Sequence, residues 1–529
     1  MFRFLDKKHT VAGPGYNRWL VPPAALAIHL SIGMAYGFSV FWKPLEQAIG
    51  ITAPAPNDWK RGSLLVTFTL FFVLLGSSAA IFGGWLERNG PRKAGVVAAF
   101  CWGGGLFISA LGVYLHQIIL LWVGAGVIGG CGLGLGYISP VSTLIKWFPD
   151  KRGMATGMAI MGFGGGALVG APLADALMKH YATSTSVGVW ETFLTMGVIY
   201  LAAMLCGAFT YRVPAPGWAP HGWTAPDQSG SAMMTQGHVH VKDAHKAHQF
   251  WLLWAVLCLN VSAGIGILSV ASPMLQEVFG GKLIGLQASL SALTEVQKAS
   301  VATIGAAFAG LLSLFNIGGR IFWASLSDHI GRKRTYYIFF VLGLVLYISA
   351  ASAAGMKSVS LFVGLFCVIL TMYGGGFATI PAYLADLFGT QFVGAIHGRL
   401  LTAWSTASIL GPVMVTKLHD MQVARGVAPD AAYNLPLYTL AGLLFLGFIC
   451  NLLVRPVDER HFMSEDELEE EWQLGQDKKA AAQVKPEQDD SAKPSAGTWA
   501  QVAIGWTLVG IPLAWGILKT VEKAAGFFR

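Results

Sequence analysis

Charged residues and closely spaced cysteines are scarce in this sequence. Only 12% of its 529 residues are Asp, Glu, Lys or Arg, whereas 54% are hydrophobic, which leaves too little polar surface for a soluble protein. All six cysteines lie inside apolar runs without the spacing that metal sites need, so we expect packing residues and not disulfides. The composition excludes a soluble protein.

Further absences exclude other classes. The formal net charge of +8 could indicate a nucleic-acid partner, but the basic residues form short clusters between apolar runs, where they orient loops, so we expect no nucleic acid. The apolar runs contain no paired carboxylates, the chain has no metal-spaced His/Cys cluster, and its Gly-rich stretches lack a phosphate-loop lysine. We therefore expect no enzymatic activity and no metal or cofactor.

Long apolar runs dominate what is present. Each is long enough for a helix to cross about 30 Å of hydrocarbon, and the 65 glycines suit close helix packing in lipid. We predict an all-α protein of the lipid bilayer, built of two six-helix bundles. The runs are 19–42, 62–86, 94–115, 118–140, 154–178 and 191–211, then 250–276, 300–327, 335–355, 358–385, 396–417 and 434–454.

The runs divide the chain into regions. Residues 1–211 form an N-terminal bundle and 250–455 a C-terminal bundle, joined by a polar, His-rich linker at 212–249. An acidic tail covers 456–497. Basic clusters in the loops after the second, fourth and eighth runs predict that these loops face the cytoplasm, with the N-terminus, the linker and the tail on the same side.

The end of the chain, 498–529, contains a further apolar stretch. Thr498 to Leu518 carries no charge, and its length predicts a thirteenth transmembrane helix. A helix lying in the membrane interface is the alternative, because Pro512 and the flanking lysines fit either arrangement. In the tail, Ser464-Glu-Asp-Glu467 is a capping box that predicts a short surface helix.

Two patterns occur once in each half. Residues 83–93 and 324–334 each have a small residue, an acid four positions later, a glycine three positions after the acid, and then a basic pair. Repeated halves with a site at their interface are how carriers alternate access. The second pattern, with spacings equal within one residue, is Phe148, Gly157 and Pro172 entering the fifth run and Phe388, Gly398 and Pro412 entering the eleventh.

The acid-x-x-Gly-x-basic-basic loops resemble the signature of major facilitator transporters, and this resemblance covers all twelve runs. It implies the fold of that family. Each acid can complement basic residues and a helix N-terminus across the interface between halves, and so latch one conformation. The alternative is that the charges only orient the loops. The predicted gate residues are Glu87, Arg88, Arg92, Asp328 and Arg332.

Arg320 stands in an uncharged stretch of the eighth run, about 12 Å from Asp328 along the helix. A permanently charged arginine costs at least a few kcal/mol in lipid, so it should face a polar cavity and bind an anion. Its fork of donors fits a carboxylate, and Asn316, one turn earlier, could add an amide donor. The alternative is a structural ion pair, although no acid lies near the middle of any run.

The Asn316-x-x-x-Arg320 motif, together with residues 136–153, resembles the oxalate/formate antiporter and related monocarboxylate carrier family. This resemblance covers most of the twelve runs. It implies that Arg320 matches a substrate-binding arginine of the eighth helix. It also implies that Tyr373 matches an aromatic cavity position in the tenth helix, where Phe377 lies one turn further on.

The sequence departs from the oxalate pattern in the eleventh helix. Oxalate carriers of this family place a second cation there, whereas the matching position here is Ala403 or Trp404, and we include Trp404 in the predicted substrate site. One buried cation balances one carboxylate, while a dianion would retain charge at low dielectric. His397 and Arg399 lie nearer the cytoplasmic end, and a register shift that moved one of them inward would favour oxalate again.

Residues of other helices complete the predicted site. Tyr36, Phe38 and Phe41 in the first run and Tyr137 in the fourth are candidates to line the cavity, with simple packing as the alternative. His29, near the middle of the first run, titrates near neutrality. It is a candidate for proton coupling, and a hydrogen-bonded structural histidine is the alternative.

These observations predict a secondary active transporter of small organic anions, best matched by monocarboxylates of the formate, lactate or pyruvate class. Its partners would be the carboxylate and either a proton or a counter-anion, because nothing in the sequence separates symport from exchange. The alternatives are an oxalate/formate antiporter and, more remotely, a membrane carboxylate sensor. We expect a multi-pass protein of a bacterial inner (cytoplasmic) membrane.

Overall fold

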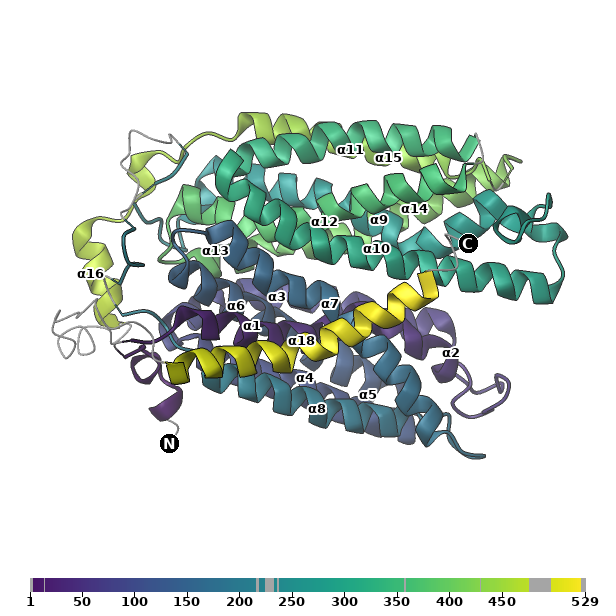
Figure 1. Cartoon of the computed structure of the whole chain (residues 1–529), viewed down its shortest axis with the longest axis horizontal. Coiled ribbons are helices and arrows are strands. Elements are labelled where there is room, and N and C mark those ends of the chain that lie inside the picture. The colour runs from purple at the N-terminus through teal and green to yellow at the C-terminus, as the bar shows by residue number, and fades with distance from the viewer. Residues whose placement is uncertain are drawn as a thin grey trace.

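Long helices that run side by side make up the chain (Figure 1). Strands are absent from the described residues, where β pairing is limited to two isolated bridges, Val11 with Val213 and Val239 with Phe462. The predicted all-α fold is confirmed. The computed structural model describes residues 3–13, 15–215, 218–223, 233–235, 237–355, 358–428, 430–474 and 496–524.

The N-terminal bundle contains the first six predicted spans. Two of them change helix type within the membrane, because η4 is a 3₁₀ helix and the Gly-rich η5 is a π-helix. The helices of this bundle are η1 Arg3–Leu5, η2 Lys7–His9, η3 Arg18–Leu20, α1 Val21–Ile32, η4 Gly33–Phe41, α2 Trp42–Leu45, α3 Arg61–Asn89, α4 Pro91–Tyr114, α5 Ile118–Leu121, η5 Trp122–Gly129, α6 Gly130–Trp147, α7 Arg152–Tyr181 and α8 Val189–Thr210.

The C-terminal bundle contains the other six predicted spans. The eleventh span is interrupted at Leu401, which separates α13 from α14. The helices from the linker to the end of the chain are η6 Ala244–Lys246, α9 His248–Phe279, η7 Gly280–Ile284, η8 Leu290–Ala292, α10 Glu295–Ile330, α11 Arg332–Gly355, α12 Val359–Phe388, α13 Val393–Leu400, α14 Thr402–Ala424, α15 Asn434–Leu453, η9 Glu459–His461, α16 Glu465–Leu474 and α18 Ala496–Ala524.

Twelve helices of the described residues are long and apolar enough to cross a membrane, eleven in the two bundles and one at α18. The eleventh predicted span is outside this group, since its two pieces, α13 and α14, are short or polar. It nevertheless packs within the bundles, against α3 and α9. Two six-helix bundles with an additional C-terminal helix are therefore present.

The two bundles meet along two interfaces that position the site. Helix α7 of the first half packs along α10 of the second, which we call the α7–α10 seam. Helix α3 of the first half packs along α13 and α14, which we call the α3–α13 seam. Glycines allow both approaches: a β-carbon on Gly157 would lie 2.7 Å from the Arg320 carbonyl oxygen, and one on Gly398 would collide with the Ala79 backbone. The repeated glycines thus occupy equivalent places.

One end of the bundle carries the predicted gate charges, and we call it the basic end. The described part of the linker packs on it instead of standing in solvent, since the Val239 amide donates to the Phe388 carbonyl and Val239 is buried. The tail joins this layer through the Met463 amide, which donates to the His238 carbonyl. The predicted capping box is confirmed: Ser464 and Glu467 exchange backbone-to-side-chain hydrogen bonds at the start of α16.

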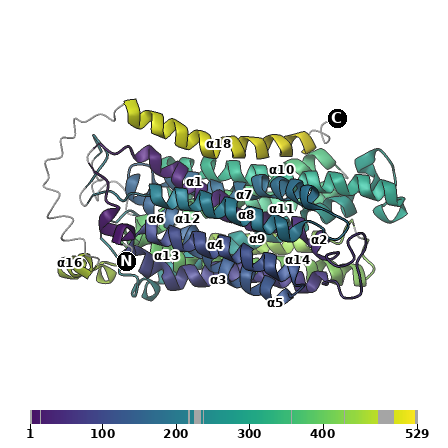
Figure 2. The same ribbon diagram turned by 90° about the horizontal axis from the view of Figure 1, so that it is seen from below.

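Helix α18 lies on the outside of the bundles (Figures 1 and 2). It contacts η3 and α1 of the N-terminal half, then α7, then α10 of the C-terminal half. Its length and direction follow the other spans, which fits a transmembrane helix and not a helix lying across the membrane surface.

Candidate binding site

Arg320 is fully buried in α10 at the α7–α10 seam. Its Nη1 donates to the carbonyl oxygen of Ile160 in α7 at 2.8 Å, so the guanidinium reaches across to the other half. Its Nη2 has no hydrogen-bond acceptor among the described residues. The ion pair with a protein acid, which was the structural alternative, is not seen in that part of the chain.

Asn316 holds the guanidinium in place. Its Oδ1 accepts from Nε of Arg320 at 3.2 Å, as the spacing of one helical turn allows. The sequence suggested an amide donor aimed at the ligand, whereas the structure uses the amide oxygen to orient Arg320. Asn316 therefore acts on the site through the arginine.

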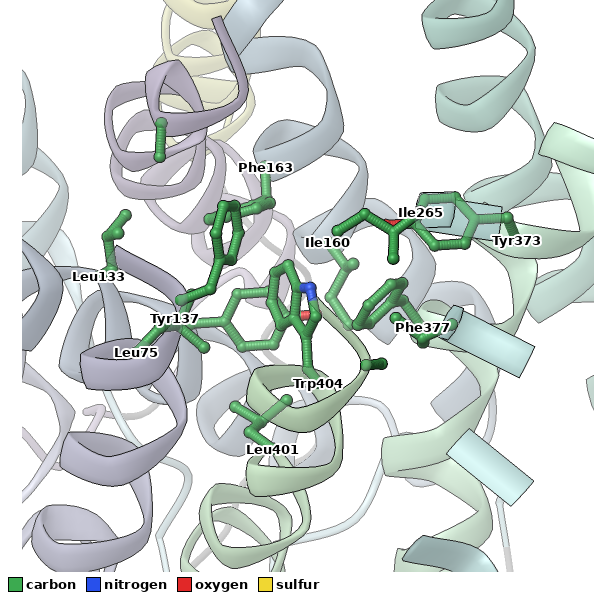
Figure 3. Close-up of a cluster of buried hydrophobic side chains, with 14 of the residues drawn as sticks. Leu75, Leu133, Tyr137, Ile160, Phe163, Ile265, Tyr373, Phe377, Leu401 and Trp404 are labelled. Carbon is green, nitrogen blue, oxygen red and sulfur yellow. The ribbon is translucent and has the colours of Figure 1, made fainter. Parts of the chain in front are cut away.

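Aromatic side chains from both halves pack together in one buried cluster (Figure 3). Trp404 lies at their centre, with ring centroids 4.5 Å from Phe377, 5.3 Å from Phe163 and 5.4 Å from Tyr137. The Arg320 guanidinium carbon lies 5.6 Å from the Phe377 ring centre, which is within reach of a cation–π interaction. The predicted residues of four different helices thus converge.

Tyr36 and Tyr373 connect the halves on another side of this cluster. Their hydroxyl oxygens are 3.3 Å apart, within hydrogen-bond distance. Phe38 and Phe41 lie elsewhere, because both rings pack on Phe193 inside the N-terminal bundle. The first span thus contributes Tyr36 to the site and uses the two phenylalanines as core.

Within this cluster, three buried donors have no hydrogen-bond partner among the described residues: Arg320 Nη2, the Tyr137 hydroxyl and Trp404 Nε1. Leaving a buried donor unpaired costs about 1–3 kcal/mol, and such groups call for an explanation in a native structure. Donors grouped around a guanidinium are suited to an anion with several acceptor lone pairs. A carboxylate has this chemistry.

His29 in α1 is buried beside the same cluster. Nδ1 lies 2.5 Å from the Ala159 carbonyl oxygen and Nε2 lies 3.1 Å from the Tyr137 carbonyl oxygen. A neutral imidazole can donate from one nitrogen only, whereas an imidazolium can donate to both carbonyls. The carbonyls that contact His29 and Arg320, those of Ala159 and Ile160, are consecutive in α7.

Asp328 closes the basic end of the α7–α10 seam. Its two carboxylate oxygens accept from the amides of Gly153 and Met154 in the first turn of α7, both at 2.8 Å. An acid at a helix N-terminus satisfies free amides and complements the helix dipole. Arg332 donates to Asp328 at 2.6 Å and to Asp386 at 3.2 Å, so it shares one network with the acid of its own repeat.

Glu87 occupies the equivalent position in the α3–α13 seam. It accepts from the Gly394 amide in the first turn of α13 at 3.1 Å, across the halves. Ser142 and Lys146 of its own half donate to the same carboxylate at 2.7 and 2.5 Å. The two predicted acids thus make the same contact with equivalent helices.

Arg88 and Arg92 do not enter these networks. Arg88 pairs with Glu471 of α16 at 3.3 Å. Arg92 donates to the carbonyl oxygens of Phe4 and Tyr211 inside the N-terminal half. In the first repeat these basic residues therefore anchor the tail and the chain start, whereas in the second repeat Arg332 contacts the acid of the repeat.

The structure also adds residues that the sequence had not assigned. Arg152 of α7 donates to Asp386 of α12 at 3.0 Å and so ties the two halves together. Phe163 packs against Trp404, as reported above, from the glycine run of α7.

Burial and the cations Arg152 and Lys146 lower the pKa of His238, so this linker histidine is neutral near pH 7 and adds no charge to the basic end.

His397 and Arg399 occupy different surroundings. Arg399 donates to the Val241 carbonyl of the linker, at the basic end and away from the aromatic cluster. His397 is buried with its ring 5.9 Å from that of Tyr137, and neither nitrogen has a partner among the described residues. The register of the eleventh span therefore leaves Trp404, and not Arg399, at the centre.

Two equivalent helical bundles, a buried cation where they meet and charged contacts between their helix ends define a membrane carrier. The sequence profile of the Major Facilitator Superfamily matches residues 24–412 and 284–522. The chain belongs to this family of multi-pass membrane transporters.

Curated relatives are similar to large parts of the chain. It is 28% identical over 398 residues to the oxalate:formate antiporter of Oxalobacter formigenes, covering 75% of this chain and 83% of that protein. It is 29% identical over 392 residues to apicoplast pyruvate carrier 1 of Toxoplasma gondii, covering 64% and 66%. Human monocarboxylate transporter 11 matches at 27% identity over 215 residues, which is 40% of this chain and 41% of the relative.

Solved structures support the fold. The proton:xylose symporter XylE, bound to 6-bromo-6-deoxy-D-glucose, superposes with a TM-score of 0.60 at 14% identity, covering 86% of this chain and 98% of that one. The transporter FucP in its outward conformation gives a TM-score of 0.56 at 13% identity, covering 82% and 99%.

Proposed function

We propose that this protein is a secondary active transporter of small monocarboxylates, of the formate, lactate or pyruvate class, and that Arg320 binds the carboxylate. The observation that carries the proposal is the buried guanidinium whose Nη2 has no acceptor in the described residues. A carboxylate would accept from it through a charge-assisted hydrogen bond and balance its charge. Tyr137 and Trp404 would supply further donors.

The preference for one carboxylate follows from the count of cations. Among the described residues, Arg320 is the only arginine or lysine with a reported contact to the aromatic cluster, because Arg399 contacts the linker at the basic end. A second carboxylate would meet the apolar face of Trp404 without a countercharge, which is costly at low dielectric. The pyruvate carrier among the relatives supports this preference.

Oxalate/formate exchange is the second candidate, supported by the oxalate:formate antiporter among the relatives. It needs a second positive charge at the site. A protonated His29 would supply one, since its two nitrogens face two carbonyl oxygens.

The same histidine is our candidate for proton coupling. Arg320 and His29 draw on consecutive carbonyls of α7, so their charges repel, and an anion bound at Arg320 would favour protonation of His29. Proton and anion would then move together. Exchange of one anion for another does not require His29 to gain or lose a proton.

Access would alternate by opening the contacts of Asp328 and Glu87 at the basic end. We propose that this end faces the cytoplasm of a bacterium, in its inner membrane, because short loops rich in Lys and Arg stay on that side.

Uptake into liposomes tests these proposals. The purified protein would be reconstituted and supplied with labelled formate, lactate, pyruvate or oxalate, with or without an inward proton gradient and with or without internal anion. We expect saturable monocarboxylate uptake that exceeds oxalate uptake. Oxalate uptake that requires internal formate, with no monocarboxylate uptake, would overturn the single-cation argument.

His29→Gln separates the two coupling modes. If His29 carries the proton, this variant loses gradient-driven accumulation but retains exchange of internal for external monocarboxylate, because exchange does not return the empty carrier. Gradient-driven accumulation that is unchanged in the variant would exclude His29 as the proton site.

A further inference from the structure

Helix α18 has two apolar faces. The spacing of three and four residues along each face is that of one side of a helix. An amphipathic interfacial helix would need one polar face. Two apolar faces instead fit a helix with protein on one side and lipid on the other. The face toward the bundles is Val502, Trp506, Val509, Leu513 and Ile517, and the exposed face is Ile504, Leu508, Ile511, Trp515 and Leu518.

The inner face of α18 touches both halves of the carrier. Near its start, a β-carbon on Gly505 would lie 3.2 Å from Pro23 of α1, and further along, one on Gly516 would lie 2.6 Å from the Leu168 carbonyl oxygen of α7. Near its end, Thr520 lies 3.1 Å from the β-carbon position of Gly310 in α10. The helix therefore bridges the α7–α10 seam from the basic end toward the opposite end.

The middle of α18 lies close to Arg320 on the outer side of α7. On α7, a β-carbon at Gly164 would lie 3.0 Å from Arg320 Nε, whereas a β-carbon at the next residue, Gly165, would lie 2.9 Å from Leu513 of α18. Ile317, one turn before Arg320, packs in the same small cluster as Leu513. Two glycines and one side chain thus separate the guanidinium from α18.

The α7–α10 seam is also the seam that the Asp328 gate holds closed. Opening it separates the first turn of α7 from α10, because the amides of Gly153 and Met154 must leave the carboxylate. A helix packed on both α7 and α10 loses contacts when the two move apart. Its packing is therefore stronger in the conformation seen here than in one where the seam has opened.

We propose that α18 is a clamp across the α7–α10 seam, which favours the conformation closed at the basic end and covers the lateral wall of the Arg320 site. The proposal relies on the alternating access that we propose above, but its test needs no substrate. In lipid, close packing and not apolar burial holds helices together. The glycine contacts of α18 are therefore where the clamp can be broken.

Two leucine substitutions in α18 form a matched pair. Gly516→Leu places a side chain against the Leu168 backbone and should lift α18 from α7. Gly510→Leu is the control, because a β-carbon there meets nothing within 4 Å. Release is monitored in a Gly310→Cys/Thr520→Cys background, whose oxidative cross-link reports that α18 lies on α10.

The readout is hydrogen exchange of the backbone amides of residues 152–157 in lipid nanodiscs, followed by mass spectrometry. With the clamp broken, the gate opens more often, so exchange should be at least about fivefold faster in Gly516→Leu, the lower range of coupling between sites. Gly510→Leu should exchange like the unmodified protein. Equal acceleration in both variants would show general loosening and overturn the proposal.

If Gly516→Leu still cross-links, α18 has stayed on α10 and this variant does not test the clamp. A chain lacking residues 496–529 then removes α18 altogether. Faster exchange at 152–157 in the shortened chain, reversed by adding a peptide of residues 496–529, supports the clamp. Exchange that is unchanged in a folded, shortened chain overturns it. The liposome assay reports separately on transport, so failure of the clamp and failure of the proposed function give different results.

Discussion

The two seams between the halves have the same backbone design and different chemistry. Each brings a glycine of one half, Gly157 or Gly398, onto the backbone of a helix of the other half. Each closes at the basic end with an acid that accepts from the first turn of the opposing helix, from two amides for Asp328 and one for Glu87. These shared features come from the internal repeat.

The charges on the two seams differ. Asp328 belongs to a network in which Arg332 connects it to Asp386, and Asp386 pairs with Arg152 of the other half. Among the described residues, Glu87 pairs with one cation, Lys146, which belongs to its own half. The α7–α10 seam also carries Arg320 and is covered by α18. The repeat thus supplies a symmetric frame, and in our proposal the α7–α10 seam provides both the anion site and the stronger gate.

Replacing the cation of each seam, Arg320 or Arg399, should give the largest difference in uptake between the two seams. Arg320→Gln removes the charge and the fork of donors, so we expect monocarboxylate uptake to fall at least about 100-fold, the size of a lost interaction of roughly 3 kcal/mol. Arg320→Lys keeps the charge and should retain part of the uptake. The matched control is Arg399→Gln, with uptake within about threefold of the unmodified protein. Liposome uptake at equal protein incorporation measures all three.

Neutralising the acid of each seam, Asp328 or Glu87, should give a smaller difference, in the maximal transport rate. Asp328→Asn breaks the contacts to two amides and to Arg332, so we expect the maximal rate to fall about tenfold, with substrate affinity little changed. Glu87→Gln should lower it only about threefold, because fewer charges depend on it. Initial rates over a range of substrate concentrations separate rate from affinity. A loss confined to affinity in Asp328→Asn would contradict its gate role.

The basic residues of the repeats should show the smallest effect. Arg332→Gln should reduce the maximal rate several-fold, since Arg332 connects Asp328 to Asp386. Arg92→Gln should leave the rate within about twofold but lower the melting temperature, because Arg92 holds the chain start and Tyr211. Equal effects on rate would show that the two seams are closer in function than in structure.

The sequence predicted the spans, the repeat and the depth of Arg320, because a bilayer forces long apolar runs and makes a buried charge conspicuous. It could not predict which side chains meet Arg320. The Ile160 carbonyl and the ring of Phe163 come from another half of the chain, and nothing local marks them. The break at Leu401 and the packing of the linker on α12 depend in the same way on tertiary contacts.

The predicted gate residues likewise divide into those whose contacts the sequence could predict and those whose contacts it could not. Asp328 and Glu87 were recognisable because the pattern around them is repeated. Arg88 and Arg92 share that pattern yet contact α16 and the chain start, since those segments lie beside them in the fold and their sequences give no sign of it.

Equilibrium binding tests the central claim, that one carboxylate binds at Arg320, without the transport cycle. Labelled pyruvate and labelled oxalate would be titrated against the purified protein, Arg320→Gln and Arg399→Gln, after circular dichroism shows that all three are folded. We predict that pyruvate binds the unmodified protein and Arg399→Gln equally well, that it does not bind Arg320→Gln, and that oxalate binds more weakly. Undiminished binding of pyruvate to folded Arg320→Gln would contradict the account.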